Sequence, residues 1–329
     1  MRQMKDVLKN KLDTFAENRS TISKEFVFQN DELSTAAALV FTNAGKSPDI
    51  EKIKECRKIL QGKTGLLSGF QGMVELILIS KMSLQANPEN YIDDVLEVYN
   101  QLKSNKIVDY YEEIMASMTL VESGRFTERE SVIAKYKEII KRMKKEHPIL
   151  TDHEDFSFVM LLALIEKDVD TIIVEIEECF DYMRKNFPAG QNAIQGISEV
   201  FALYDTDVKT KCDKAIEIYN LLKERGVKYG RNHEFASLAI LTNIDADTNV
   251  LIDEIAEASE YLKQKKGFGD WAIGSSERLM FAAMATAGTY DTTINDLGNA
   301  ATNTIAVIVA EEIEMMMMTT IMTTNMVVF

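Results

Sequence analysis

Two histidine–glutamate pairs are the residues of this chain whose types could most directly do chemistry. They are His153–Glu154 and His233–Glu234, and imidazole with carboxylate is a ligand combination that zinc accepts. The pairs lie 80 residues apart, and neither forms the H-E-x-x-H spacing of zinc hydrolases. Each pair alone supplies too few ligands to hold an ion. We therefore expect no metal site and no other cofactor.

Other catalytic patterns are also missing. The stretch GFGDWAIG (267–274) contains three glycines, but their spacing is wrong for a phosphate-binding loop and no predicted strand precedes it. Serine and cysteine residues lack a local signature that would tie them to histidine and aspartate. The three cysteines are odd in number and widely separated, so neither a disulfide framework nor a C-x-x-C site is indicated. The sequence thus favours a non-enzyme over an enzyme without deciding between them.

Charge and hydropathy narrow the partners and the compartment. The 329 residues include 37 basic and 52 acidic side chains, a formal net charge of −15, which disfavours binding to nucleic acid. The first 20 residues interleave charged and apolar side chains at helical spacing, unlike the continuous apolar stretch of a signal peptide. The longest late apolar run, residues 305–310, is too short to span a bilayer. We expect a cytoplasmic protein with no membrane span.

The strongest signal is an internal repeat of about 40 residues. Candidate helix caps recur at spacings of 39–41 residues, and each precedes a stretch of helical periodicity: Ser47, Asn87, Thr127, Asp168, Asp207 and Asp247. A second series marks the ends of the same helices with one apolar residue each: Leu60, Leu102, Met143, Met183, Leu222 and Leu262. Thr127 and Glu130 also match a capping box.

Two helix types alternate within the period, one amphipathic and one apolar nearly all round. Such alternation is typical of stacked helical hairpins, in which the inner helix is covered by both neighbours. We predict an all-α, α-solenoid-like array of about seven hairpins, with two separate bundles as the alternative. The predicted parts are an N-terminal helix (1–31), the hairpin domain (32–290) and a long C-terminal helix with a methionine-rich tail (291–329). That C-terminal helix either caps the last repeat or mediates association with a partner or a second copy.

Long connections leave the amphipathic helices, and longer connections carry function more often than short ones. In a stacked array they lie along one edge, which we call the loop edge. It collects the candidate binding residues Tyr110, Tyr111, His147, His153, Glu154, Tyr229, His233, Trp271 and Arg278. The alternative interpretation of both His–Glu pairs is that they simply begin the next helix, where an acidic side chain favours the helix dipole.

Two of these candidates have competing structural explanations. We expect Trp271 to plug the last hairpin, with stacking on a ligand as the alternative. We expect Arg278 on the exposed edge of an otherwise apolar helix, with a buried ion pair to Glu277 or Asp270 as the alternative.

Two segments resemble an uncharacterised bacterial family. They are HPILTDHEDFSFVMLLAL (147–164) and YLKQKKGFGDWAIGSSERLMFAAM (261–284), which are similar to domain-of-unknown-function family 4003. The resemblance extends over most of the chain and implies a cytoplasmic bacterial protein. It implies no activity and no site residues.

The function that fits these observations best is a protein- or peptide-binding scaffold or adaptor. A ligand-sensing regulator, or an enzyme of unrecognised type with its site on the loop edge, is the alternative. The sequence identifies no specific partner.

Overall fold

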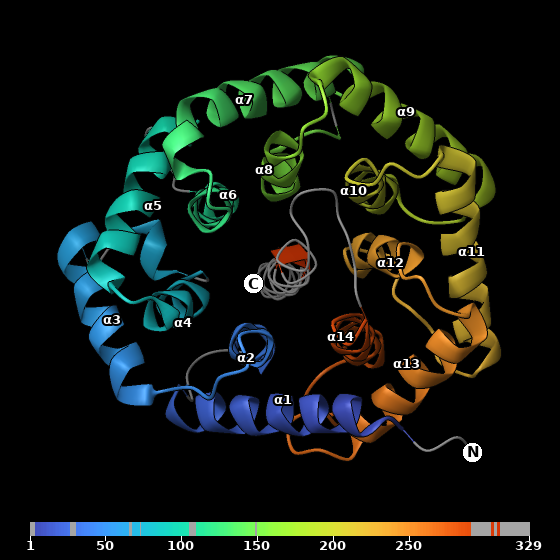
Figure 1. Ribbon diagram of the computed structural model, residues 1–329, viewed down its shortest axis with the longest axis horizontal. Helices are drawn as coiled ribbons and strands as arrows, with labels where there is room; N and C mark the ends of the chain where they lie inside the picture. Colours follow the sequence, from blue (N-terminus) through green and yellow to red (C-terminus); the bar gives the residue numbers. More distant parts are fainter. Residues whose placement is uncertain are drawn as a thin grey trace, which may run out of the picture.

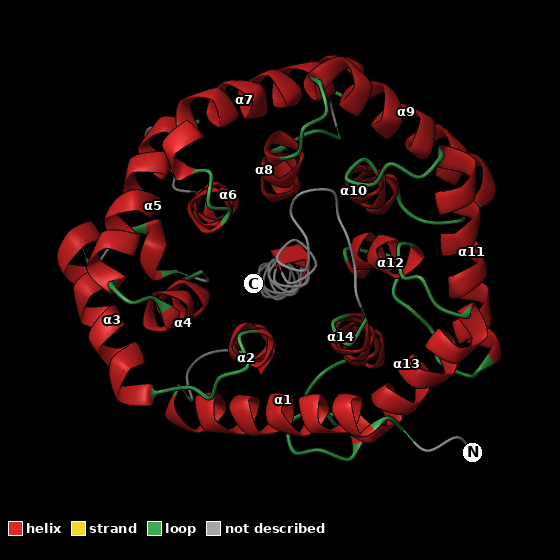
Figure 2. Cartoon of the chain, viewed as in Figure 1, coloured by secondary structure: helices red, strands yellow, loops and turns green. Residues whose placement is uncertain are grey.

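The described part of the chain is entirely helical. The computed structural model describes residues 4–26, 31–65, 68–72, 74–104, 110–148, 150–290, 304–305 and 308–309. Within these ranges it contains fourteen α-helices, three short 3-10 helices and no strand, as Figure 2 shows. The predicted all-α class is confirmed.

The helices form two concentric circles (Figure 1). Seven make the outer circle: α1 (Asp6–Glu25), α3 (Ile50–Thr64), α5 (Pro88–Leu102), α7 (Arg129–Glu146), α9 (Val169–Asn186), α11 (Val208–Glu224) and α13 (Thr248–Lys263). Seven stand inside it: α2 (Asp31–Asn43), α4 (Glu75–Leu84), α6 (Tyr111–Glu122), α8 (Phe156–Leu164), α10 (Gln191–Phe201), α12 (Glu234–Thr242) and α14 (Ser275–Ala287). Each outer helix packs on the inner helix that follows it, and inner helices pack on one another in the pairs α2–α4, α6–α8, α8–α10, α10–α12 and α12–α14.

The circle closes because α1 packs against α13 and α14. Phe15 of α1 lies against Phe268 and Phe281, with ring centroids 5.0 and 5.8 Å apart. Asp13 of α1 accepts a 2.8 Å hydrogen bond from the Tyr261 hydroxyl. The N-terminal helix is therefore a member of the outer circle, paired with α2, and the array has no open end at this point.

Capping explains where most outer helices begin. Asn87, Asp168, Asp207 and Asp247 each accept a hydrogen bond from the backbone N–H three residues later, as predicted. The other two caps are wrong. Asp49, not Ser47, caps α3, since its carboxylate accepts from the Lys52 N–H. A 3-10 turn, Phe126–Glu128, takes up the segment around Thr127, so α7 begins only at Arg129 and the predicted capping box does not form.

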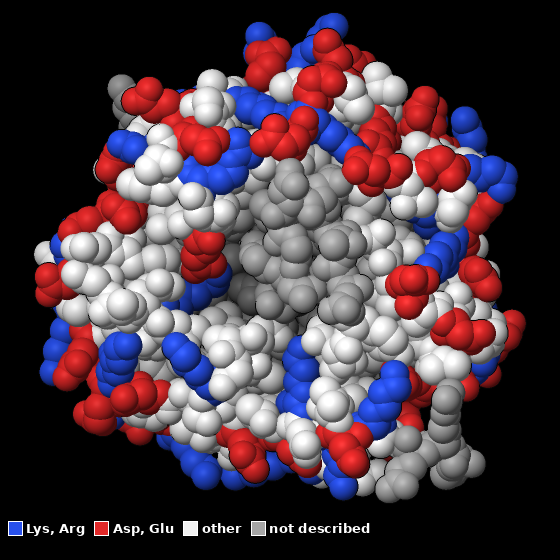
Figure 3. All heavy atoms as spheres, in the orientation of Figure 1, with Lys and Arg blue, Asp and Glu red and all other residues white. Residues whose placement is uncertain are grey.

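The six helix-end residues singled out in the sequence share one environment. Leu60, Leu102, Met143, Met183, Leu222 and Leu262 are all buried. The inner helices are buried nearly all round, whereas the outer helices keep one charged face toward solvent. Figure 3 shows this from one side of the ring: acidic and basic side chains mix over the outer circle, and the described surface nearer the centre is mostly uncharged.

Lysines of the outer helices bind the carboxyl ends of inner helices. Their ammonium groups donate to backbone carbonyl oxygens at the ends of inner helices or just beyond them, at the negative end of each helix dipole. The pairs are Lys52 with Gln85 (3.2 Å), Lys135 with Ile165 (2.6 Å), Lys211 with Phe201 (2.8 Å) and Lys214 with Ile244 (3.1 Å). Lys211 is 1% exposed, so this is a structural role for a fully buried charge.

Part of the C-terminal region lies at the centre of the ring. Ile305, Ile308 and Val309 are buried, and residues 304–305 and 308–309 are helical. The rest of the predicted C-terminal helix, including Met315–Met318, lies outside the described residues.

Candidate functional site

The loop edge is the side of the ring at which the chain enters the inner helices. The candidate residues do not converge there on a single cleft. They divide into a group around His153, a separate His147–Glu177 pair, Tyr229 and His233 beside α12, and Trp271 and Arg278 in the last hairpin.

The first group forms at the start of α6. His153, in the 3-10 turn His153–Asp155 (η3), places Nδ1 2.7 Å from Oε1 of Glu112. Tyr110 stacks on the His153 ring, with centroids 4.9 Å apart and planes 15° from parallel. Glu112 is buried and His153 half-exposed, so the imidazole covers a buried carboxylate. Tyr111 is half-buried against the core, and the side chain of Glu154 lies outside the described part.

His147 makes a separate pair at the end of α7. Its Nε2 lies 2.8 Å from Oε2 of Glu177, and its ring packs on Phe180 with centroids 4.7 Å apart. His147 thus joins two neighbouring outer helices, and the structure gives it a different glutamate partner from that of His153.

Tyr229 and His233 flank the entry to α12. Tyr229 is 1% exposed and its hydroxyl lies 2.7 Å from that of Ser237, so it is a core residue with a satisfied polar end. His233 precedes the first residue of α12, Glu234, whose carboxylate is buried against Gly230. A Cβ at position 230 would lie 2.3 Å from the Glu234 carboxyl carbon, which explains why a glycine stands there.

Both structural expectations for the last hairpin are wrong. Trp271 is fully exposed rather than a core plug, because Phe268 and Ile273 fill that core instead. Arg278 is 5% exposed rather than on an open edge. It forms the predicted alternative, a 2.9 Å ion pair with Asp270, and donates to the Phe268 carbonyl at 3.0 Å.

Sequence reasoning missed a series of carboxylates in the first turns of the inner helices or just before them. They are Glu75, Glu113, Asp155, Glu234 and Glu277, separated by 38, 42, 79 and 43 residues, the third gap spanning two repeats. Three of them accept a backbone N–H from the preceding connection: Glu113 from Ser104, Asp155 from Asp152 and Glu277 from Gly274. Their spacing matches the repeat period and was the available signal. Their shared role is to hold the long connections onto the inner helices.

More carboxylates lie between α6 and α10 than are needed to hold the connecting loops. Glu112 and Glu199 add two further carboxyls, both at most 1% exposed, next to Glu113 and Asp155. The carboxyls of Asp155 and Glu199 lie close enough to influence each other's protonation, and Gln195 Nε2 donates to Asp155 Oδ1 at 2.8 Å. We call Glu112, Glu113, Asp155, Gln195 and Glu199 the carboxylate cluster.

Burial raises the pKa of two carboxyls of this cluster. Removal from water raises the pKa of the Asp155 carboxyl to about 6, against hydrogen bonds that favour its charged form. Burial likewise raises the pKa of Glu113. Several buried oxygens have no hydrogen-bond partner in the described structure: Glu112 Oε2, Glu113 Oε2 and Gln195 Oε1.

The space beside the cluster is small. Asp155, Phe158, Asn192, Gly196 and His233 line a hollow of about 20 Å³ between α8, α10 and α12. A water needs roughly 10–15 Å³ of such space, so the hollow admits one water and no substrate. Among the described residues, no three histidine, cysteine or acidic side chains converge closely enough to hold a metal ion.

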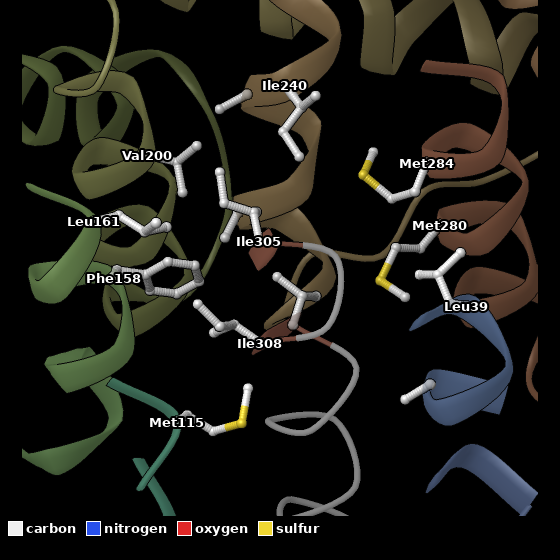
Figure 4. Close-up of a cluster of buried hydrophobic side chains, with 14 of the residues drawn as sticks. Leu39, Met115, Phe158, Leu161, Val200, Ile240, Met280, Met284, Ile305 and Ile308 are labelled. Atoms are coloured by element: carbon white, nitrogen blue, oxygen red, sulfur yellow. The ribbon is translucent and has the colours of Figure 1, made fainter. Parts of the chain in front are cut away.

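The inner face of the ring offers a larger and more apolar surface. Figure 4 shows Ile305 and Ile308 surrounded by side chains from six inner helices. These are Leu39 of α2, Met115 of α6, Phe158 and Leu161 of α8, Val200 of α10, Ile240 of α12, and Met280 and Met284 of α14. All are buried. We call this set the inner face.

Comparison with known proteins identifies the family. The chain matches the model of a protein of unknown function, DUF4003, over residues 18–316, and therefore belongs to that family. No curated protein matches the chain, and no solved structure does. Among the described helices, none combines the length and the apolar character needed to cross a bilayer.

Proposed function

We propose that this protein binds an apolar helical segment of a protein partner on its inner face. The observation that carries the proposal is the burial of Ile305 and Ile308 among side chains of six inner helices (Figure 4), with Val309 buried as well. An inner face that accepts a helical segment of its own chain has the shape and chemistry to accept a similar segment from another protein. Recognition of an amphipathic helix through apolar residues spaced three or four apart is a common mode of peptide binding.

The side chains of the inner face suit such a role. Met115, Met280 and Met284 carry flexible thioethers that adapt to different apolar partners. The acidic net charge of −15 supports a protein partner over nucleic acid. The scaffold or adaptor role, the helical-repeat character and the cytoplasmic location predicted from the sequence belong to the same proposal.

Competition within the full-length chain tests it. The probe is a fluorescein-labelled peptide with the sequence of residues 299–316, added to wild type and to an Ile305→Ser/Ile308→Ser variant. In the wild type the chain's own residues compete at an effective concentration on the order of millimolar, so the peptide should bind poorly. The double variant weakens that competitor, and the peptide should bind it at least ~10-fold more tightly.

Controls separate this effect from general stickiness. A Val7→Ser variant removes an exposed apolar residue on the outer circle and should bind the peptide as the wild type does. A peptide carrying both serine substitutions should not bind the double variant. If the double variant unfolds, or binds the peptide no better than the wild type, Ile305 and Ile308 are ordinary core residues and the proposal fails.

A sensing or catalytic role at the loop edge is the second candidate. The observation in its favour is the buried Asp155 carboxyl, whose pKa is raised by burial to about 6 and which lines a water-sized hollow. An ionisable carboxyl that lowers stability at neutral pH is typical of a functional group. The pH-dependent stability of an Asp155 variant, developed in the Discussion, tests whether this carboxyl has that character.

A further inference from the structure

The outer surface carries a hollow at the junction of α9 and α11, separate from both sites above. It measures about 620 Å³, within the range of ligand and peptide sites. The residues that line it come from the first turns of α9, the loop before α11 and the start of α11: Asp170, Thr171, Val174, Glu175, Glu178, Asp205, Thr206, Asp207, Val208 and Lys209.

The floor of this hollow has a valine where three other outer helices carry an aspartate. Val174 lies six residues after the cap Asp168, and the equivalent positions in α5, α11 and α13 hold Asp93, Asp213 and Asp253. Each of those aspartates contacts the preceding repeat: Asp93 with Lys63, Asp213 with Tyr182 and Asp253 with Arg225. Val174 is instead 56% exposed, one of three large apolar side chains so exposed in the described structure. The structure does not need a valine there, so a contact outside the chain explains it best.

The rim is acidic. Five carboxylates and one ammonium line the hollow, and the ammonium of Lys209 is drawn to Asp213 one turn along α11. Lys167 lies between Glu175 and Asp205 at 2.8 and 3.1 Å, and Arg142 pairs with Asp170. Lys211, which pairs with Glu175, brings the number of cations to four. Asp213 brings the number of carboxylates to six, so the rim keeps a net charge of −2.

An anion is a poor fit, although two helices begin at this hollow. At each helix start a capping carboxylate already occupies the place of an anion, because Asp168 accepts from the Thr171 N–H at 2.9 Å and Asp207 from the Thr210 N–H at 3.1 Å. Those hydrogen bonds hold the pKa of both carboxyls below its usual range, so both stay ionised. Glu178 is exposed at the rim and takes part in no ion pair that the described structure shows.

We propose that the hollow between α9 and α11 is a docking site for a basic peptide segment of a partner protein, in which one apolar side chain rests on Val174 and flanking lysines or arginines face the acidic rim. An apolar anchor within a charged rim is the usual anatomy of a protein interface. The site is independent of the inner face, so a partner could engage both.

Binding of a simple probe to the full-length chain tests this proposal. The probe is a fluorescein-labelled peptide of one leucine with three lysines on each side, followed by fluorescence anisotropy. Val174→Asp restores the residue found at the equivalent positions, so it should fold normally while removing the anchor. Glu178→Lys reverses a rim charge, and Glu257→Lys makes the same change at the equivalent exposed position of α13.

We expect saturable binding to the wild type at low salt. Val174→Asp and Glu178→Lys should each weaken it about tenfold, Glu257→Lys less than about twofold, and a peptide with serine for leucine should bind about tenfold less tightly. The proposal is wrong if the wild type does not bind the peptide, or if Glu257→Lys weakens binding as much as Glu178→Lys. It is also wrong if Val174→Asp folds as the wild type does and binds unchanged, or if the serine peptide binds equally, since attraction would then be charge alone. Circular dichroism of each variant confirms the fold before binding is compared.

Discussion

Replacing Asp155 by asparagine should make stability less dependent on pH. Its pKa lies at about 6 in the folded chain against an ordinary 3.8. A carboxyl whose pKa is raised by folding favours the folded state while it is protonated, and that contribution is lost as pH rises from 3.8 through 6. The difference of about 2.2 units corresponds to roughly 3 kcal/mol, at about 1.36 kcal/mol per unit.

The substitution should leave few hydrogen bonds unmade. Asp155 Oδ2 accepts from the Asp152 N–H at 2.9 Å, and Oδ1 accepts from Gln195 Nε2. An asparagine amide keeps one acceptor for the Asp152 N–H. Its NH₂ group can then donate to Gln195 if that amide rotates to present Oε1, which has no partner in the described structure.

The assay is thermal unfolding of wild type and variant at about pH 4.5 and about pH 7.5, with the difference between the two proteins followed against pH. At the lower pH the two should be within about 1 kcal/mol. At the higher pH the variant should be more stable by up to about 3 kcal/mol. That gain corresponds to about 4 °C for an unfolding entropy of roughly 2.1 cal/mol/K per residue.

A matched control is Asp207→Asn, the same change at an exposed cap, where asparagine caps a helix about as well as aspartate. Its pKa shift is in the opposite direction, so it should not gain stability as pH rises. A difference between wild type and Asp155→Asn that stays constant with pH would refute the reasoning, because Asp155 would then be ionised throughout.

Three further substitutions test the packing, each read from urea unfolding. Gly267→Ala should lower the free energy of unfolding by about 1–3 kcal/mol more than Gly226→Ala does. Both glycines have positive φ, but only at Gly267 would a Cβ clash with a guanidinium of the neighbouring α1. Equal losses would show that the contact of α1 with the last hairpin rearranges without loss of stability. Lys211→Met should lower the free energy of unfolding by about 3 kcal/mol, because it removes one partner each from the Phe201 carbonyl and the half-buried Glu175 carboxylate; a neutral result would show that water replaces the ammonium. Trp271→Ser should change stability by less than about 0.5 kcal/mol, since the indole is fully exposed, and a larger loss would place it in the core after all.

The sequence predicted the local structure well because local structure depends on residues close together in the chain. Asn87, Asp168, Asp207 and Asp247 cap the helices that they precede, and their spacing follows directly from the repeat. The Ser47 prediction failed because two acceptors, Ser47 and Asp49, stand within one turn, and only the geometry of the entering chain decides between them. Closure of the ring depends on a contact such as Tyr261 with Asp13, 248 residues apart, which no local pattern reports.

The candidate site was less predictable because residue type does not fix exposure in a loop. Trp271 and Phe268 are both aromatic residues of one glycine-containing connection, yet Phe268 is buried against Phe15 and Trp271 is exposed. Which of the two turns inward depends on α1, an element from the opposite end of the sequence. Arg278 could be placed only once Asp270 was known to reach it.

In a repeat structure, the residues that depart from the repeat are better guides to function than those that follow it. A carboxylate at the start of an inner helix recurs around the ring and holds a connecting loop, so Glu113 needs no further explanation. Glu199 departs from that pattern, because it lies in the third turn of α10 rather than at its start and is fully buried close to Asp155. On the outer circle an exposed aspartate recurs and links neighbouring repeats, whereas Val174 at the same position links nothing within the chain. Each departure lowers stability relative to the regular pattern. Glu199 buries a carboxyl, and Val174 exposes an apolar side chain. Those two places, and the inner face around Ile305, are therefore the positions at which we propose a function for this ring.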